Sequence, residues 1–178
     1  MATYIVFLRA INVGSRYVKM QDLRGHLEDA GFGSVETHIQ TGNVRVTSRA
    51  RSAGAVATAV EKTLRDALGF EVPSIVRTPS ELAAVVREAP ASPLGEAARH
   101  YLFLLKETPS TSAAAELDGW AVDGERMLVA GRDVHLWTTT PFHKVKASNA
   151  RVEKLASTAS TARDWKVVST LAQKWASA

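Results

Sequence analysis

The sequence predicts an α+β protein with a ferredoxin-like β-α-β-β-α-β N-terminal half, fused to a second, partly repeated split β-α-β motif. Two runs, Tyr4–Leu8 and Tyr101–Leu105, are apolar on both faces, which is typical of strands covered on both sides. Between and after these runs, segments with strand periodicity alternate with segments of helical periodicity. No linker rich in Gly, Ser or Pro divides the chain, so we expect subdomains at 1–78 and 79–178, packed as one compact body.

Each element of the N-terminal half has its own periodicity and its own stop signal. In chain order we expect a strand at 3–8, a helix at 20–30 ended by Gly31, a strand at 35–39, a tight turn at 41–43, a strand at 44–47, a helix at 56–67 ended by Gly69, and a strand at 72–77. Gly and Asn tolerate the positive φ of a tight turn. Glycine just beyond the last apolar position is a frequent helix end.

The second half repeats much of this order. We expect a helix from the capping box Thr78-Pro79-Ser80-Glu81 to Pro90, a strand at 100–106, a helix at 110–117, hairpin strands at 127–130 and 134–137, and a helix at 149–157. Residues 120–122 are a further candidate for pairing with the hairpin. A second capping box at Thr161–Asp164 predicts the start of the last helix, whose apolar stripe runs from Trp165 to Trp175.

Composition excludes several classes of protein. The chain has 178 residues, of which 46% are hydrophobic and 22% charged, as is common for globular domains. No apolar run approaches the ~18 residues of a membrane span, and no signal peptide is visible. The absence of cysteine excludes disulfides, thiolate zinc sites and cysteine nucleophiles. We therefore expect a cytoplasmic protein that has no membrane partner.

Basic charge is concentrated at the two ends of the chain. The net charge is +4, and residues 1–78, 79–140 and 141–178 contribute +3, −4 and +5. Such ends favour phosphate-bearing partners, although a charge of this size is also ordinary for solubility. The C-terminal cations form a possible basic rim, or alternatively a solvated face: Lys144, Lys146, Arg151, Lys154, Arg163 and Lys166.

Topology predicts a candidate ligand site at one end of the first sheet. The first two strands of a split motif are parallel, so the loop after the first strand lies at the same end as the hairpin between the second and third. This placement gathers cations, amides and hydroxyls beside a helix N-terminus, which attracts anions. The candidate ligand-binding residues are Arg9, Asn12, Gly14, Ser15, Lys19, Gln40, Thr41, Gly42 and Asn43. In the alternative interpretation, these polar groups only satisfy loop backbone.

No other motif identifies an activity. The five histidines lack metal-ligand spacing and are interpreted as surface or packed side chains, so we expect no metal and no cofactor. Nucleophile-elbow, phosphate-loop and dinucleotide motifs are absent. Glu71 is the only acidic residue expected near the loop and hairpin, so the catalytic residues of any enzyme stay unknown.

The residues from Phe7 to Val44, FLRAINVGSRYVKMQDLRGHLEDAGFGSVETHIQTGNV, resemble the opening of a bacterial family named domain of unknown function 1697. The family pattern is similar to LRGINVGG, K-M-x-x-L-R and Y-I-Q-S-G-N, from which Ala10, Ser15 and His38 depart. Residues 72–81, 146–149 and 161–165 resemble later family segments, the second of them weakly. The resemblance implies a ferredoxin-like α+β fold and no established activity.

Three functional hypotheses remain. The first is a binding module for a phosphate-bearing or other anionic ligand, either a small molecule or nucleic acid, at the loop and hairpin. The second is an enzyme acting on a small anionic substrate at the same place, with Arg9 and Lys19 holding the anion and Asn12 and Gln40 orienting it. The third is a structural or interaction protein without a ligand. The fold does not choose among them.

Overall fold

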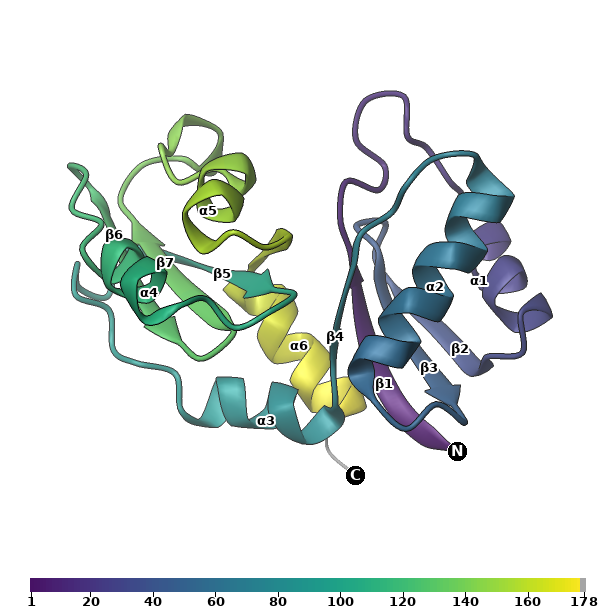
Figure 1. Cartoon of the computed structure of the whole chain (residues 1–178). Coiled ribbons are helices and arrows are strands. Elements are labelled where there is room, and N and C mark those ends of the chain that lie inside the picture. Colours follow the sequence, from purple (N-terminus) through teal and green to yellow (C-terminus); the bar gives the residue numbers. More distant parts are fainter. Residues whose placement is uncertain (177–178) are drawn as a thin grey trace. The chain divides into compact units, whose positions relative to one another are not determined.

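The N-terminal half of the chain forms an antiparallel sheet with two helices on one face. The computed structural model describes residues 1–176. The elements are β1 (Ala2–Leu8), α1 (Met20–Asp29), β2 (Gly33–His38), β3 (Asn43–Ser48), α2 (Ala53–Leu68) and β4 (Ser74–Arg77). The strands lie in the order β2-β3-β1-β4, and β1 is antiparallel to both of its neighbours. This is the ferredoxin-like order, and Figure 1 shows α1 and α2 on the same side of the sheet.

Local signals explain the ends of these helices. Ser52 accepts a hydrogen bond from the Ala55 amide at the start of α2, and Gly69 ends the helix in the left-handed conformation, with φ of 78°. One core then joins the helices to the sheet, and its members include Tyr4, Val6 and Leu8 of β1, Leu23 and Leu27 of α1, and Val56, Val60 and Leu64 of α2. Ile11 and Val18 belong to this core as well, so both ends of the loop between β1 and α1 are anchored.

The second half forms another sheet of the same kind. After α3 (Pro79–Arg87), the elements are β5 (Arg99–Leu105), α4 (Thr111–Asp118), β6 (Glu125–Ala130), β7 (Asp133–Thr138), a short 3-10 turn at Phe142–Lys144, α5 (Asn149–Ala156), β8 (Ser160–Asp164) and α6 (Trp165–Trp175). The strand order is β6-β7-β5-β8. The second split motif is therefore complete, whereas the sequence predicts only its first five elements. Residues 120–122 lie outside the strands.

The expected capping box at Thr161–Asp164 is wrong, because these residues belong to β8. Leu102 and Phe103 of β5 pair with Arg163 and Ala162. A strand this polar is stable here because the Arg163 guanidinium donates to the Thr161 hydroxyl (2.7 Å) and to the Ala162 carbonyl (2.9 Å). Asp164 has a different role from the one expected: it is itself the cap of α6, since its Oδ1 accepts from the Lys166 amide at 2.8 Å.

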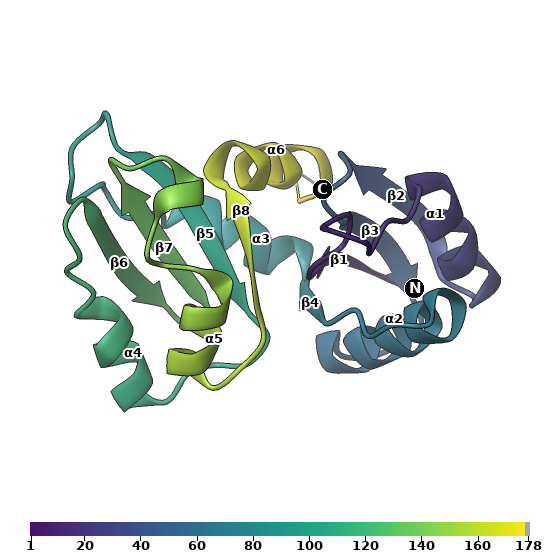
Figure 2. The same cartoon turned by 90° about the horizontal axis from the view of Figure 1, so that it is seen from above.

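Helices α4 and α5 cover one face of the second sheet (Figure 2). Phe103, Leu105 and Leu136 of the sheet share a buried core with Leu117 of α4 and Val152 of α5. Ser110 and Ser148 cap the two helices. The buried Glu125 carboxylate accepts hydrogen bonds from the amides of Lys146 and Ala147, which fixes the segment that leads into α5.

The chain forms two compact units. Residues 1–84 and 171–176 make one unit, and Val85–Thr170 make the other. The capping box at the start of α3 is confirmed, since the Thr78 amide donates to Glu81 Oε2 (2.7 Å) and the Glu81 amide to Thr78 Oγ1 (3.2 Å).

Within residues 1–176, no helix combines the length and the apolar composition needed to cross a bilayer.

Candidate functional site

The loop between β1 and α1 contacts the hairpin between β2 and β3, at the end of the sheet where topology predicts it. Asn12 Nδ2 donates to the Gln40 carbonyl at 2.8 Å, and the Leu8 amide donates to the Gly42 carbonyl at 2.8 Å. The segment before β4 lies at this end too, because the Arg9 amide donates to the Pro73 carbonyl at 2.9 Å. Residues far apart in the chain therefore form one continuous surface, which we call the loop–hairpin surface (residues 9–19 and 38–43).

Two amide side chains of this surface hold backbone in place. Asn12 Oδ1 accepts from the Val18 amide at 2.8 Å, in addition to the bond that Nδ2 makes to the hairpin. Asn43 is fully buried, and its Nδ2 donates to the His38 carbonyl (3.1 Å) and to the Thr41 hydroxyl (2.9 Å). These contacts hold backbone segments together, so Asn12 and Asn43 fit the interpretation in which the polar groups satisfy loop backbone.

The other predicted residues differ in how accessible they are. Gly14, Ser15, Lys19, Gln40 and Thr41 are exposed, Arg9 is half-buried and Gly42 is buried. Within the described part of the chain, the side chains of Ser15, Lys19 and Gln40 make no hydrogen bond. Lys19 immediately precedes α1, and α1 has no side-chain cap at its first turn. The accessible polar groups therefore lie on the open surface of the loop and the hairpin.

The sequence prediction missed the exposed apolar residues of this surface. Val13, Tyr17 and Ile39 are 65%, 62% and 48% exposed. Tyr17 stands between two cations in the chain, Arg16 and Lys19. Arg16 is held in position, because its Nη1 donates to the Glu71 carbonyl (3.3 Å) and its guanidinium lies 5.3 Å from the centre of the Phe70 ring. In the sequence, the Arg-Tyr-Val-Lys segment within a polar loop is the signal that could have identified the exposed Tyr17.

The C-terminal basic rim requires one correction. Lys144, Lys146, Arg151, Lys154 and Lys166 are exposed. Arg163 is buried, at 7% exposure, because it faces away from solvent in β8, and burial lowers the pKa of its guanidinium to about 10. Arg163 is therefore not part of an exposed rim.

Two of the histidines that were expected to be surface or packed side chains, His100 and His135, form a pair. His135 Nδ1 and His100 Nε2 are 2.9 Å apart. The register of β5 and β7 explains this contact, since His100 is opposite Trp137 and His135 is opposite Leu102, which places both imidazoles on one face of the sheet. Strand register is not visible in the sequence. The only trace of the pair in the sequence is the position of one histidine in each of two predicted strands.

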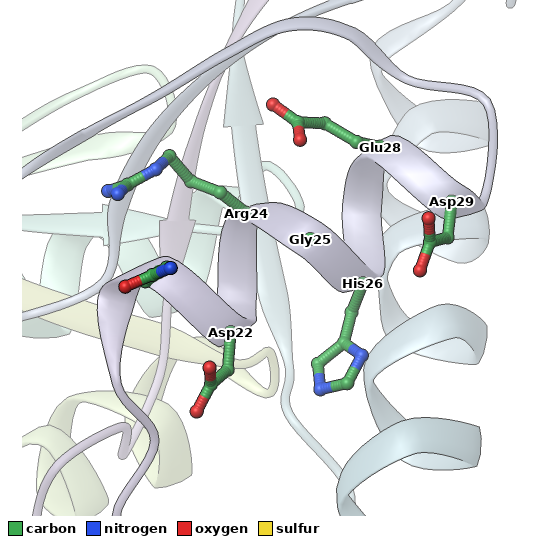
Figure 3. A pocket seen from close by; sticks show the side chains of 7 residues that line it. Asp22, Arg24, Gly25, His26, Glu28 and Asp29 are labelled. Carbon is green, nitrogen blue, oxygen red and sulfur yellow. The ribbon is translucent and has the colours of Figure 1, made fainter.

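A shallow hollow runs along α1 (Figure 3). Its polar side chains do not converge, because Arg24 and Glu28 point to one side of the helix while Asp22, His26 and Asp29 point to the other. Arg24 is also occupied by a hydrogen bond to the Thr37 hydroxyl at 2.7 Å. Among residues 1–176, no three His, Asp or Glu side chains gather closely enough to hold a metal ion. The hollow thus offers no common point at which a ligand would be bound.

Comparison with known proteins agrees with the fold. A solved structure titled conserved bacterial protein SP0830 from Streptococcus pneumoniae has 20% sequence identity to this chain, and the match covers 98% of each chain with a TM-score of 0.78. A search of curated proteins found no match. The family model described as protein of unknown function (DUF1697) matches residues 1–135. The chain therefore belongs to the DUF1697 family.

Proposed function

We propose that the protein is a cytoplasmic binding module whose loop–hairpin surface binds a phosphate-bearing ligand, and that this ligand is single-stranded nucleic acid. The proposal depends mainly on the exposure of Tyr17, a 62% exposed aromatic residue between Arg16 and Lys19 in the chain. Proteins that bind single strands combine cations, which contact phosphates, with aromatic rings on which bases stack.

Three further features support this proposal. The loop that presents Tyr17 is pinned at Ile11, Asn12 and Val18, so binding requires little ordering of the loop. The accessible polar groups lie on an open surface, which suits an extended strand better than a small enclosed anion. The aromatic residues of β1, Tyr4 and Phe7, are buried, so contact through the sheet face is disfavoured and the ligand is expected at this edge.

The other two hypotheses have less support at this surface. An enzyme would need a base close to the anion. The Glu71 carboxylate instead lies 3.5 Å from the Arg65 guanidinium. A structural or interaction role accounts for Asn12 and Asn43 and for the exposure of Val13, Tyr17 and Ile39, but it leaves the two cations beside Tyr17 without a reason.

The proposal is tested by titrating fluorescent single-stranded RNA and DNA against the protein over a series of salt concentrations. We expect affinity to fall steeply with salt. Tyr17→Ala should weaken binding by about tenfold, because one stacked base is lost. Lys19→Gln should lower the slope of log affinity against log salt by about 1.

Arg49→Gln is the matched control, because this exposed cation follows β3 and so lies at the opposite end of the same sheet. It removes the same charge and should leave affinity nearly unchanged. No binding at low salt would overturn the proposal, as would equal losses from Lys19→Gln and Arg49→Gln. The latter result would mean that only net charge attracts the strand.

A further inference from the structure

The second unit contains a hollow beside the histidine pair. Its volume is about 360 Å³, within the range of small-molecule sites, and it is lined by Arg99, His100, Tyr101, Asp164, Trp165 and Lys166. Arg99, Asp164 and Lys166 are exposed at its edge, whereas His100, Tyr101 and Trp165 are half-buried. Tyr101 alternates with His100 along β5 and its ring packs on Phe142 (4.3 Å between centroids), so the aromatic rings beside the hollow are those of His100 and Trp165. The hollow therefore combines aromatic walls with a charged edge on which cations outnumber carboxylates.

The aromatic walls are held rigidly. The His100 ring stacks on Trp137 (centroids 4.8 Å apart, planes at 15°) and on Trp165 (4.2 Å, 22°). His100 is also bonded to His135, so its orientation is fixed from several directions. Rigid aromatic surfaces cost little entropy when a flat ligand binds against them.

His100, one member of the histidine pair, supplies an uncharged polar group beside this hollow. Burial lowers the pKa of both His100 and His135 to about 4, and for His100 the neighbouring imidazole adds to the effect, so both rings are neutral at neutral pH. One ring donates the hydrogen bond of the pair and the other accepts it. Within the described residues, neither outer ring nitrogen, His100 Nδ1 nor His135 Nε2, has a hydrogen-bond partner. His100, which lines the hollow, thus has a polar atom to offer a ligand.

The charged edge favours an anion over a cation. The Asp164 carboxylate is committed to the start of α6, where its Oδ1 accepts from the Lys166 amide. Arg99 and Lys166 take part in no ion pair within the described residues. A ligand group of negative charge would therefore meet two available cations.

We propose that this hollow binds a small planar aromatic molecule that carries one anionic group. The ring stacks against the indole of Trp165, the anionic group lies between Arg99 and Lys166, and the outer nitrogen of His100 hydrogen-bonds to the ligand. The site is separate from the loop–hairpin surface, since all of its residues belong to the second unit.

The test follows the indole N–H signal of Trp165 by two-dimensional NMR during titration of matched probes. Benzoate and phenyl phosphate carry both a planar ring and an anionic group, benzyl alcohol lacks the charge, and cyclohexanecarboxylate lacks the planar ring. We expect both planar anions to shift the signal in a saturable manner and to bind about tenfold more tightly than either of the other probes. The comparison of benzoate with phenyl phosphate shows whether a carboxylate or a phosphate is preferred.

Variants separate the two interactions. Lys166→Gln should weaken benzoate binding by about fivefold, because an exposed cation is removed without loss of packing. Lys154 is an exposed cation on α5, and Lys154→Gln should leave benzoate binding unchanged. Tyr17→Ala should also leave benzoate binding unchanged. Trp165→Leu, in which binding is followed by the backbone amide signal of Lys166 because the indole is absent, should abolish the preference for planar over non-planar anions. The inference is overturned if neither planar anion binds, if cyclohexanecarboxylate binds as tightly as benzoate, or if Lys166→Gln has no more effect than Lys154→Gln.

Discussion

At the scale of single residues, two glycines of the loop–hairpin surface have positive φ for different reasons. Gly42 has φ of 77°, and a Cβ atom there would lie 2.8 Å from Leu8 Cβ and 3.2 Å from Ile11 Cγ2. Gly14 has φ of 61°, but a Cβ atom there would meet nothing within 4 Å. The hairpin turn therefore approaches β1 closely, whereas the tip of the loop is open.

This difference gives a matched pair of substitutions. Gly14→Ala should lower the free energy of unfolding by about 1 kcal/mol, the cost of left-handed backbone for a residue with a Cβ. Gly42→Ala carries the same cost and adds overpacking against Leu8, so we expect a loss of about 3 kcal/mol. Urea denaturation measures both values. Equal losses would show that the hairpin does not pack on β1 as described.

At the scale of elements, the pairing of β5 with β7 makes stability depend on pH. The pKa of His100 and of His135 is about 4 in the folded protein, below the ordinary 6.5, so between these values the unfolded chain binds more protons. Stability from this pair is therefore fully present above about pH 6.5 and is lost as the pH falls toward 4. Urea midpoints measured at several pH values across this window should decrease with falling pH.

Two variants identify the source of that pH dependence. The double variant His100→Gln/His135→Gln should flatten the decrease, because glutamine does not titrate. His143→Gln removes an exposed histidine and should leave the decrease as it is. The pH dependence of stability does not come from the contact of β5 with β7 if the double variant keeps the full pH dependence of the wild-type protein.

At the scale of the whole molecule, the last residues of α6 belong to the first unit. Trp175 belongs to the same unit as β2, and its Nε1 donates to Glu36 Oε2 at 3.1 Å across 139 residues of sequence. Its ring also meets His38 edge-on, with 6.3 Å between centroids. Trp175 is buried, so these contacts are shielded from solvent.

Substitution of Trp175 should therefore weaken a sheet that is distant from it in sequence. Trp175→Ala should cost about 3 kcal/mol, and Trp175→Phe, which keeps most of the ring packing, about 1 kcal/mol. Hydrogen exchange would show reduced protection of the β2 and β3 amides in both variants. Loss of protection only in β6 and β7 would contradict the assignment of Trp175 to the first unit.

Elements with their own periodicity were predictable, and those stabilised by distant partners were not. The continuous apolar run of β1 and the glycine after α2 are local signals, and both elements lie where the sequence predicts them. The polar β8 has no such signal, because it exists only by pairing with β5 and by the internal hydrogen bonds of Arg163. The local pattern at 161–164 therefore predicts a helix start where the folded protein has a strand.

The candidate site likewise has features that the sequence predicts and features that it does not. The order of elements in the sequence is enough to place the loop after β1 and the hairpin at one end of a sheet, because that order sets strand direction. Three features are visible only in the folded protein: Asn12 and Asn43 brace the backbone, Tyr17 is exposed, and His100 is in contact with His135. Hydrogen-bond partners, burial and strand register depend on residues distant in the chain, and no local pattern encodes those pairings.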